Sequence, residues 1–254
     1  MKPKPGATLY LVPTPLDFGS EAVPLTQVLP FQSIETAARL SHWVAENAKT
    51  LRAFLKRIDG HAHLCQAMQA IQISELPRAV HKHGDHRGEF DARPLLAPAM
   101  NGHDMGLASE AGMPAVADPG SSVVRAAHEL GLRVAPLVGP VSLLLALAAS
   151  GLNGQNFAFV GYLPQEANAR VARLRQLEQW AIQSGQTQLW IETPYRNAAV
   201  WSAALNVLQG STRLCMARGL TLADQVVKTH TVADWRQMGI GPDSAAPVVF
   251  AMGR

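Results

Sequence analysis

Apolar and polar positions along the chain form short apolar runs separated by amphipathic stretches. Short apolar runs predict buried strands, and apolar positions three or four residues apart predict helices that cover them. In the first half, the pattern predicts strands at residues 8–12, 41–46, 105–108 and 132–138, and helices from residues 48, 121 and 141 onward. In the second half, it predicts strands at residues 157–162, 188–192, 212–217, 226–232 and 247–252, and helices at 166–183 and 197–208.

Strands and helices alternate regularly in the first half, whereas strands outnumber helices in the second half. This pattern predicts an α/β fold with two α/β domains, residues 1–138 and 139–254, and a mixed sheet in the second domain. The glycine-rich segment at residues 151–154 is a natural break, which leaves the boundary between about 138 and 155.

The turn that follows the predicted strand at 105–108 is the first candidate for a ligand site. It contains two prolines, Pro114 and Pro119, and two acids, Glu110 and Asp118, and a helix pattern follows with Ser121 or Ser122 as its cap. In open α/β sheets, ligands bind where such a turn leaves the carboxyl end of a strand. We therefore expect the ligand of this protein at residues 109–120.

A second candidate surface lies on the helix that Asn47 is expected to cap. Its apolar face is formed by Leu51, Phe54, Leu55 and Ile58. Three basic residues, Lys49, Arg52 and Lys56, follow a spacing of i, i+3 and i+7 and share another face. This basic face is either solvated or in contact with phosphate groups.

Residues 77–93 are polar and rich in turn formers, which predicts a long basic loop beside a substrate cleft. The loop contains His81, His83 and His86, but no cysteine or carboxylate stands at a recognised zinc spacing. We therefore expect no metal site. The stretch at 141–150 carries no charge, so we expect a helix buried against the sheet or between the domains.

Composition indicates a soluble, cytoplasmic protein. The formal net charge is +3, and charged residues make up 16% of the chain. Cys65 and Cys215 fit no metal or redox spacing and are expected as reduced thiols. Pro13 and Pro15 interrupt the apolar start of the chain, and no apolar window approaches the roughly 18 residues of a membrane span. No glycine fingerprint for a dinucleotide or ATP is present, which argues against both ligands.

Eight short motifs in a fixed order resemble those of one known family. They are LYLVPTPL at 9–16, SEAGMP at 109–114, ADPG at 117–120, LVGP at 137–140, ASGL at 149–152, FVGYLP at 159–164, IETPYR at 191–196 and ARGLT at 217–221. The chain is similar in these motifs to the ribosomal small-subunit RNA methyltransferase I branch of the tetrapyrrole methylase superfamily. The similarity covers nearly the whole chain.

This resemblance implies two α/β domains, a homodimer, and S-adenosylmethionine bound in the cleft between the domains. It implies ribosomal RNA as the substrate, methylated on a ribose 2′-oxygen. By matching position, the cofactor site would use Pro13, Pro15, Glu110, Gly112, Val116, Asp118, Ser142, Tyr162, Leu163, Glu192, Ala217 and Arg218. The final strand, at residues 247–251, would close over the adenine.

The chain departs from the family pattern mainly on the acceptor side. Asn47, Ala48 and Lys49 stand where the family has Asp, Thr and Arg. Gly84 replaces an Asn, Gly219 replaces a Glu, and Met113 replaces a Thr. These departures keep two alternatives open: methylation of a small molecule such as a tetrapyrrole, and a non-catalytic protein that retains the fold and the cofactor.

A ribose hydroxyl must lose its proton during methyl transfer, so a base is needed beside the acceptor. We expect Glu46 or His83 in this role, with Lys49 and Arg52 holding phosphate. The alternative for Glu46 is a solvated acid at a helix start, where negative charge is favourable.

Overall fold

The computed structural model describes residues 6–17, 23–85, 88, 90–242 and 246–254, except for the side chains of residues 81–83. The chain divides into two compact units, Met1–Val141 and Ser142–Arg254. Each unit contains its own five-stranded sheet. The α/β class predicted from the alternating pattern is therefore confirmed.

The first unit is built on a parallel sheet with the strand order β3-β2-β4-β1-β5. The strands are β1 (Thr8–Leu11), β2 (His42–Ala45), β3 (Gln72–Glu75), β4 (Met105–Ala108) and β5 (Arg133–Pro136). The four strands expected in this half are all present, and β3 is an addition. Because every pair is parallel, the carboxyl ends of all five strands lie at one edge of the sheet.

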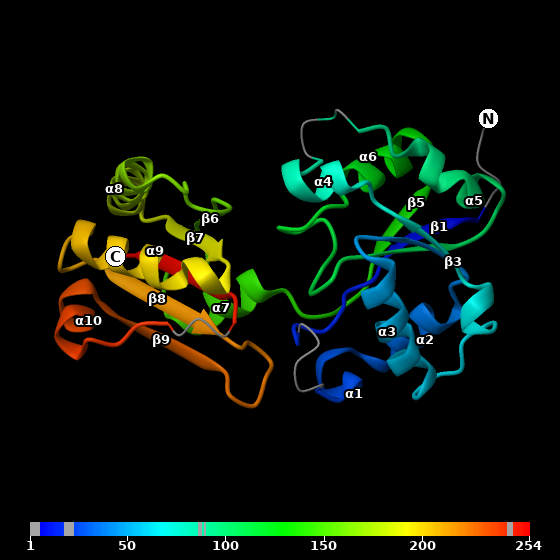
Figure 1. Cartoon of the computed structure of the whole chain (residues 1–254), viewed down its shortest axis with the longest axis horizontal. Helices are drawn as coiled ribbons and strands as arrows, with labels where there is room; N and C mark the ends of the chain where they lie inside the picture. The colour runs from blue at the N-terminus through cyan, green and yellow to red at the C-terminus, as the bar shows by residue number, and fades with distance from the viewer. Residues whose placement is uncertain (1–5, 18–22, 86–87, 89, 243–245) are drawn as a thin grey trace. The chain divides into compact units, whose positions relative to one another are not determined.

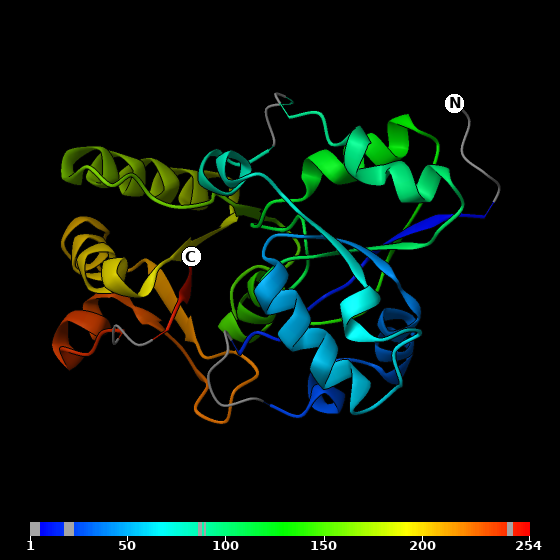
Figure 2. The same cartoon turned by 45° about the vertical axis from the view of Figure 1, so that its right-hand side comes forward.

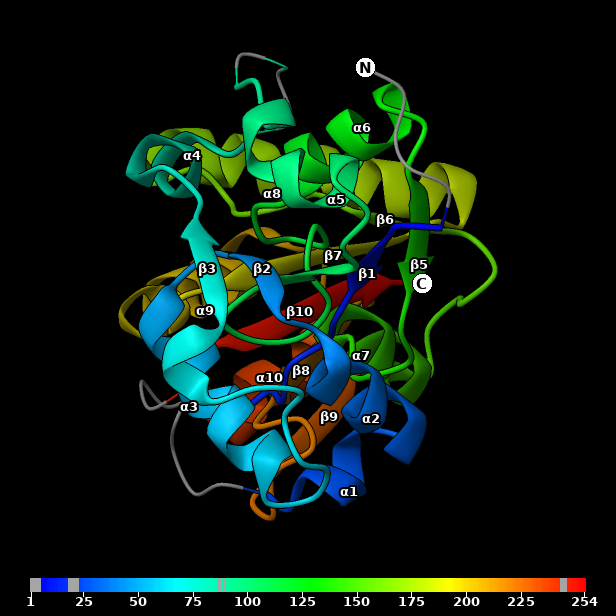
Figure 3. The ribbon, with the colours of Figure 1, turned by 90° about the vertical axis from the view of Figure 1, so that its right-hand side faces the viewer.

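Helices cover both faces of this sheet (Figures 1 and 3). One face carries α1 (Leu25–Val28), α2 (Phe31–Arg39) and α3 (Ala48–Asp59), and the other carries α4 (Arg78–His83), α5 (Ala97–Met100) and α6 (Ser121–Glu129). Two 3₁₀ turns, η1 (Met68–Ala70) and η2 (Arg93–Leu96), complete the unit. On β2, Trp43 and Ala45 pack toward α2 and α3, while Val44 packs toward the opposite core. This alternation follows from the two-residue period of a strand.

The connections define where a ligand can enter the first unit. After β1 the chain runs through α1 and α2 on one face, and after β4 it runs through α6 on the other face. Because β1 and β4 are neighbours, the two connections diverge at the carboxyl ends of these strands. Open α/β sheets bind ligands at such a point, which we call the crevice between β1 and β4.

Two local expectations for this unit need correction. Residues 77–93 are not simply a loop, because α4 lies within them and packs through Val80 onto the second core of this unit. The cap of α6 is not Ser121 or Ser122: the N-cap position is Gly120, with φ 136°. The expected cap of α3 is confirmed, since Asn47 accepts hydrogen bonds from the backbone N–H groups of residues 49 and 50.

The second unit is built on a mixed sheet, as expected, with the order β6-β7-β10-β8-β9. Its strands are β6 (Phe157–Phe159), β7 (Thr187–Glu192), β8 (Arg213–Arg218), β9 (Val226–Thr231) and β10 (Val248–Gly253). Only β6 and β7 pair in parallel among these strands, and the other pairs are antiparallel.

Helices α8 (Ala167–Ser184), α9 (Pro194–Val207) and α10 (Val232–Met238) pack on one face of the second sheet, and α7 (Ser142–Ser150) packs on the other (Figure 2). A cluster of large aromatic side chains, Trp190, Trp201, Trp235 and Phe250, fills the three-helix side. The sequence pattern did not predict α10, which follows β9 directly and is capped by Thr231.

Helix α7 packs against the second sheet, as expected, but only one side of the helix is buried. Leu143, Ala146 and Leu147 are buried, whereas Leu144 and Leu145 are 51% and 38% exposed. A helix without charged residues can therefore still expose one of its sides to solvent.

Within the described residues, no helix combines the length and the apolar character that crossing a bilayer requires. Both cysteines are free thiols: Cys65 is exposed, and Cys215 is buried in β8.

Candidate functional site

The loops after β1 and β4 are joined directly by their backbones. Thr14 N–H donates to the Gly112 carbonyl at 2.9 Å, and Gly112 N–H donates to the Thr14 carbonyl at 3.0 Å. The Thr14 hydroxyl also donates to the Ser109 carbonyl at 3.3 Å. Pro13 and Pro15, on either side of Thr14, are buried. The two predicted cofactor motifs are therefore parts of one structure at the crevice.

Close packing at Gly139 and backbone conformation at Gly112 favour glycine at two positions of this edge. A Cβ on Gly139 would lie 2.2 Å from the Pro13 ring, so only glycine allows the loop after β5 to approach. Gly112 has φ 79°, in the left-handed region, and its Cβ would lie 3.2 Å from Leu16. Glycine at both positions lets the loops after β1, β4 and β5 approach one another closely.

The middle of the central turn is strained. Ala115 and Ala117 have φ 64° and 68°, a left-handed conformation that costs a residue with a side chain roughly 1–2 kcal/mol. Val116, between them, is 40% exposed. Such strain persists only where the surrounding structure holds it, and it concentrates at functional sites. The turn is therefore fixed in one shape before any ligand arrives.

Three carboxylates gather beside this turn. The Glu110 N–H donates to Glu46 Oε2 at 3.0 Å, and Asn47 Nδ2 donates to Glu110 Oε1 at 2.9 Å. Burial and, next, the charge of Glu46 raise the pKa of Asp118 to about 7; Glu110 adds to the effect, while a hydrogen bond from Ser109 opposes it. The three neighbouring carboxylates repel one another when they are ionised. A positively charged ligand would reduce this repulsion.

The departure at residue 47 has a structural explanation. The Asn47 side chain accepts from the N–H groups of Lys49 and Thr50 through Oδ1, and its amide donates to Glu110. A carboxylate at this position has no proton to donate to Glu110 and would add like charge to the cluster. Lys49 itself is exposed in the first turn of α3.

Helix α6 is capped by Asp85, a residue that sequence reasoning missed. The buried Asp85 carboxylate accepts from the N–H groups of Gly120 and Ser122 and from the hydroxyls of Ser121 and Ser122, at 2.6–3.0 Å. Burial alone would raise its pKa, but these hydrogen bonds outweigh burial and hold the pKa below its ordinary value. Asp85 therefore anchors the end of the central turn. No local motif marks it, because cap and helix lie far apart in sequence.

The predicted residues of the second unit meet at the carboxyl ends of β6, β7 and β8. Glu192 and Arg218 flank Val248 in register on β10. The buried Glu192 accepts from Leu163 N–H at 3.3 Å and lies 3.3 Å from the Arg196 guanidinium. Burial raises the pKa of Glu192, although Arg196 acts in the opposite direction.

Three further predicted residues complete this edge: Ala217 is buried, Tyr162 is 53% exposed, and Arg218 forms an ion pair with Asp224 at 3.5 Å. Ser142 is the first residue of α7. The predicted cofactor residues thus form two groups, one in each unit. That both groups line a single cleft stays a prediction.

His83 is the last residue of α4, and its side chain lies outside the described part of the structure, as does the whole of His86. Among the described residues, no group of three or more His, Cys, Asp or Glu side chains is arranged to hold a metal ion.

The chain has no match among family models. It resembles proteins named ribosomal RNA small subunit methyltransferase I: that of Mesorhizobium japonicum is 31% identical over 88% of this chain and 67% of its own length. The protein of Synechocystis is 30% identical over 87% and 68%, and that of Vibrio cholerae 27% over 91% and 71%. The chain thus spans about two thirds of the length of these relatives.

Solved structures share the fold. Uroporphyrin-III-C-methyltransferase from Thermus thermophilus has a TM-score of 0.51 at 15% identity, covering 98% of this chain and 94% of its own. The methyltransferase CobJ has a TM-score of 0.55 at 16% identity, covering 98% and 93%. The fold is that of the tetrapyrrole methylase superfamily, a class of methyltransferases. Within it, the chain belongs to the ribosomal RNA small subunit methyltransferase I family.

The cap of α6 gives a stability prediction. Asp85→Asn should lower the free energy of unfolding at pH 7 by about 1–3 kcal/mol, because the carboxylate accepts four hydrogen bonds. Since the folded pKa is depressed, this stabilisation is present above the ordinary Asp pKa of about 3.9 and is lost as pH falls through the folded value. Denaturant titrations at several pH values measure the difference. Glu129→Gln, an exposed change on α6 itself, is the control, and equal stability of both variants at pH 7 would contradict the assignment.

Proposed function

We propose that this protein transfers a methyl group from S-adenosylmethionine to a ribose 2′-oxygen of ribosomal RNA. The observation that carries the proposal is the group of carboxylates Glu46, Glu110 and Asp118 at the carboxyl ends of β2 and β4. Membership of the methyltransferase I family supports a methyl donor, and the names of the relatives support ribosomal RNA as the acceptor.

The donor chemistry suits the crevice. S-adenosylmethionine supplies an electrophilic methyl group on a positively charged sulfur. Negative charge on Glu110 and Asp118 favours a cation at this edge, and it does so in a partly buried place where water screens charge poorly. The strained turn around Ala115 and Ala117 offers backbone groups already held in position. No phosphate-binding glycine loop is required, because this ligand carries no phosphate.

Glu46 is placed to act on the acceptor. It follows β2 directly, and the Glu110 N–H holds its carboxylate at 3.0 Å, which limits the motion of the side chain. In the proposed reaction Glu46 accepts the proton of the ribose hydroxyl. His83 is the second candidate for this base. Lys49, exposed at the start of α3, provides a positive charge for a neighbouring phosphate.

We also propose that the protein acts as a homodimer. On edge strand β6, Phe157 and Phe159 are 43% and 36% exposed, and their side chains share one face. That face lies on the α7 side of the sheet, because Phe159 pairs with Leu189, which points away from the aromatic cluster around Trp190. Exposed aromatic pairs on an edge strand favour association with a partner chain.

Calorimetric titration tests the donor. At pH 7 the binding of S-adenosylmethionine should release up to about half a proton, because a nearby cation lowers the pKa of Asp118 from about 7. S-adenosylhomocysteine, which lacks the positive sulfur, should release less. Measuring the binding enthalpy in two buffers of different protonation enthalpy gives the proton count, and Asp118→Asn should abolish the difference between the ligands. If a folded protein binds neither ligand, the proposed function fails.

The acceptor role of Glu46 is tested by Glu46→Gln. The amide oxygen of Gln can still accept the Glu110 N–H, so the affinity for S-adenosylmethionine should stay unchanged. Methylation of undermethylated small ribosomal subunits should slow by about 10²–10⁴-fold, the usual effect of losing a general base. Glu35→Gln, an exposed change on α2, serves as the control. Unchanged turnover in Glu46→Gln would remove Glu46 from the mechanism, and methylation of a porphyrinoid instead of the subunit would favour the small-molecule alternative.

Self-association is tested by light scattering coupled to gel filtration. The wild-type protein should elute with the mass of two chains. The double variant Phe157→Ser and Phe159→Ser should shift it toward one chain, whereas Phe31→Ser, at an exposed phenylalanine in the first unit, should not. A monomeric wild-type protein would rule out the homodimer.

A further inference from the structure

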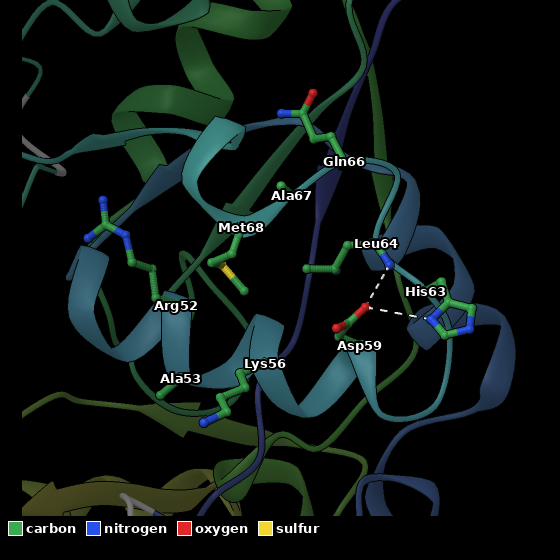
Figure 4. A pocket seen from close by; sticks show the side chains of 9 residues that line it. All are labelled: Arg52, Ala53, Lys56, Asp59, His63, Leu64, Gln66, Ala67 and Met68. Carbon is green, nitrogen blue, oxygen red and sulfur yellow. Dashed lines mark hydrogen bonds and ion pairs between the residues drawn. The ribbon is translucent and has the colours of Figure 1, made fainter.

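The first unit contains a pocket on the flank of α3 that the proposed methyl-transfer site does not use (Figure 4). Its volume is about 660 Å³, within the range of roughly 300–1,000 Å³ that is usual for ligand sites. Helix α3 and the following segment line it with Arg52, Ala53, Lys56, Asp59, His63, Leu64, Gln66, Ala67 and Met68. All of these residues belong to the first unit.

The floor of the pocket is apolar. Leu64 and Met68 are half-buried and pack on the α2–α3 core, and Figure 4 shows both side chains in the middle of the pocket. Gln66, also half-buried, adds one amide group with a donor and an acceptor. A flat, mostly apolar ring with polar edges matches this combination.

The rim of the pocket is positive. Arg52 and Lys56 are exposed, stand four residues apart on α3, and have no recorded ion pair within the described part of the chain. Arg57, on the same helix, is by contrast held by Asp17 at 2.8 Å. The acid of the pocket, Asp59, already accepts the Leu64 N–H at 3.0 Å. The two free cations are therefore available to an anionic group.

The basic row on α3 leads from the proposed acceptor side to the pocket. Lys49, Arg52 and Lys56 share the exposed face of the helix, and residues 49 to 56 span roughly 10 Å along its axis. The row begins beside Asn47 and Glu46, at the carboxyl end of β2. A polyanionic strand lying along this row would bring one of its units to the pocket.

We propose that this pocket binds one unstacked nucleotide of the RNA substrate, with its phosphate on Arg52 and Lys56 and its base over Leu64 and Met68. The proposal rests on the proposed function for the identity of the substrate. It commits to single-stranded RNA, because proteins read unpaired bases that can leave the stack, whereas the bases of a duplex are not free to enter a pocket. The pocket then positions the strand next to the ribose that is methylated.

The experiment measures binding of a fluorescein-labelled single-stranded RNA by anisotropy over a range of salt concentrations. The double variant Arg52→Ala and Lys56→Ala should bind about tenfold more weakly at low salt, and its salt slope should fall by about 0.7, the value for the one phosphate that both side chains hold. The matched control is Arg133→Ala with Lys228→Ala, which removes one exposed arginine and one exposed lysine elsewhere. The control should behave as wild type.

Two further arms separate a nucleotide pocket from a merely basic surface. Met68→Gln should weaken binding of the single strand without changing the salt slope, because it alters the base contact and no charge. A blunt RNA duplex of the same sequence should bind the wild type more weakly and respond less to the double variant. Equal loss for strand and duplex, or wild-type affinity in the double variant, would overturn the proposal.

The outcome is separable from that of the proposed function. Every variant in these arms should bind S-adenosylmethionine as the wild type does, since none of the substituted residues belongs to the crevice between β1 and β4. If the protein binds RNA through the pocket but does not bind the methyl donor, the pocket proposal holds and the proposed function fails. If the double variant methylates the subunit at the wild-type rate, the proposed function holds and the pocket proposal fails.

Discussion

Two hydrogen bonds between Thr14 and Gly112 fix the part of the molecule on which the rest of the site depends. They tie the loop after β1 to the loop after β4, at the point where the connections of these neighbouring strands leave on opposite faces of the sheet. A parallel sheet brings its strand ends to one edge, but it leaves the loops beyond them free to diverge. The two hydrogen bonds between Thr14 and Gly112 hold these loops together and support the strained turn at 113–118.

Once the turn is fixed, charge decides what the edge can bind. Glu46, Glu110 and Asp118 come from two different strand ends, and Asn47 contributes an amide where another acid would increase the repulsion. Burial and, after it, the charges of Glu46 and Glu110 raise the pKa of Asp118. Asn47, which departs from the family pattern, therefore limits the repulsion among the carboxylates of the site. The departure does not by itself indicate a lost activity.

Local sequence patterns predicted most of the elements and several site positions. The strands β1, β2, β4 and β5, the Asn47 cap and the apolar face of α3 all follow from periodicity and capping rules that act over a few residues. The motif resemblance supplied the predicted cofactor residues, and the structure places most of them at one sheet edge in each unit. The pattern overlooked β3 and α10, which are short and weakly periodic, and it assigned α4 to a loop.

By itself, the sequence determined the α/β class, the order of most elements and the family, because these depend on neighbouring residues and on motifs in a fixed order. Only the tertiary structure decided that Asp85 caps α6, that three carboxylates meet at the ends of β2 and β4, and that Leu144 and Leu145 remain exposed. It also decided that Arg52 and Lys56 border a pocket while Arg57 is held by Asp17. Each of these depends on groups that are distant in the chain and meet only when the sheet and its covering helices are assembled. Short-range periodicity carries no information about such meetings, since a side chain on a helix face looks the same in sequence whether its partner is water, a core or an ion.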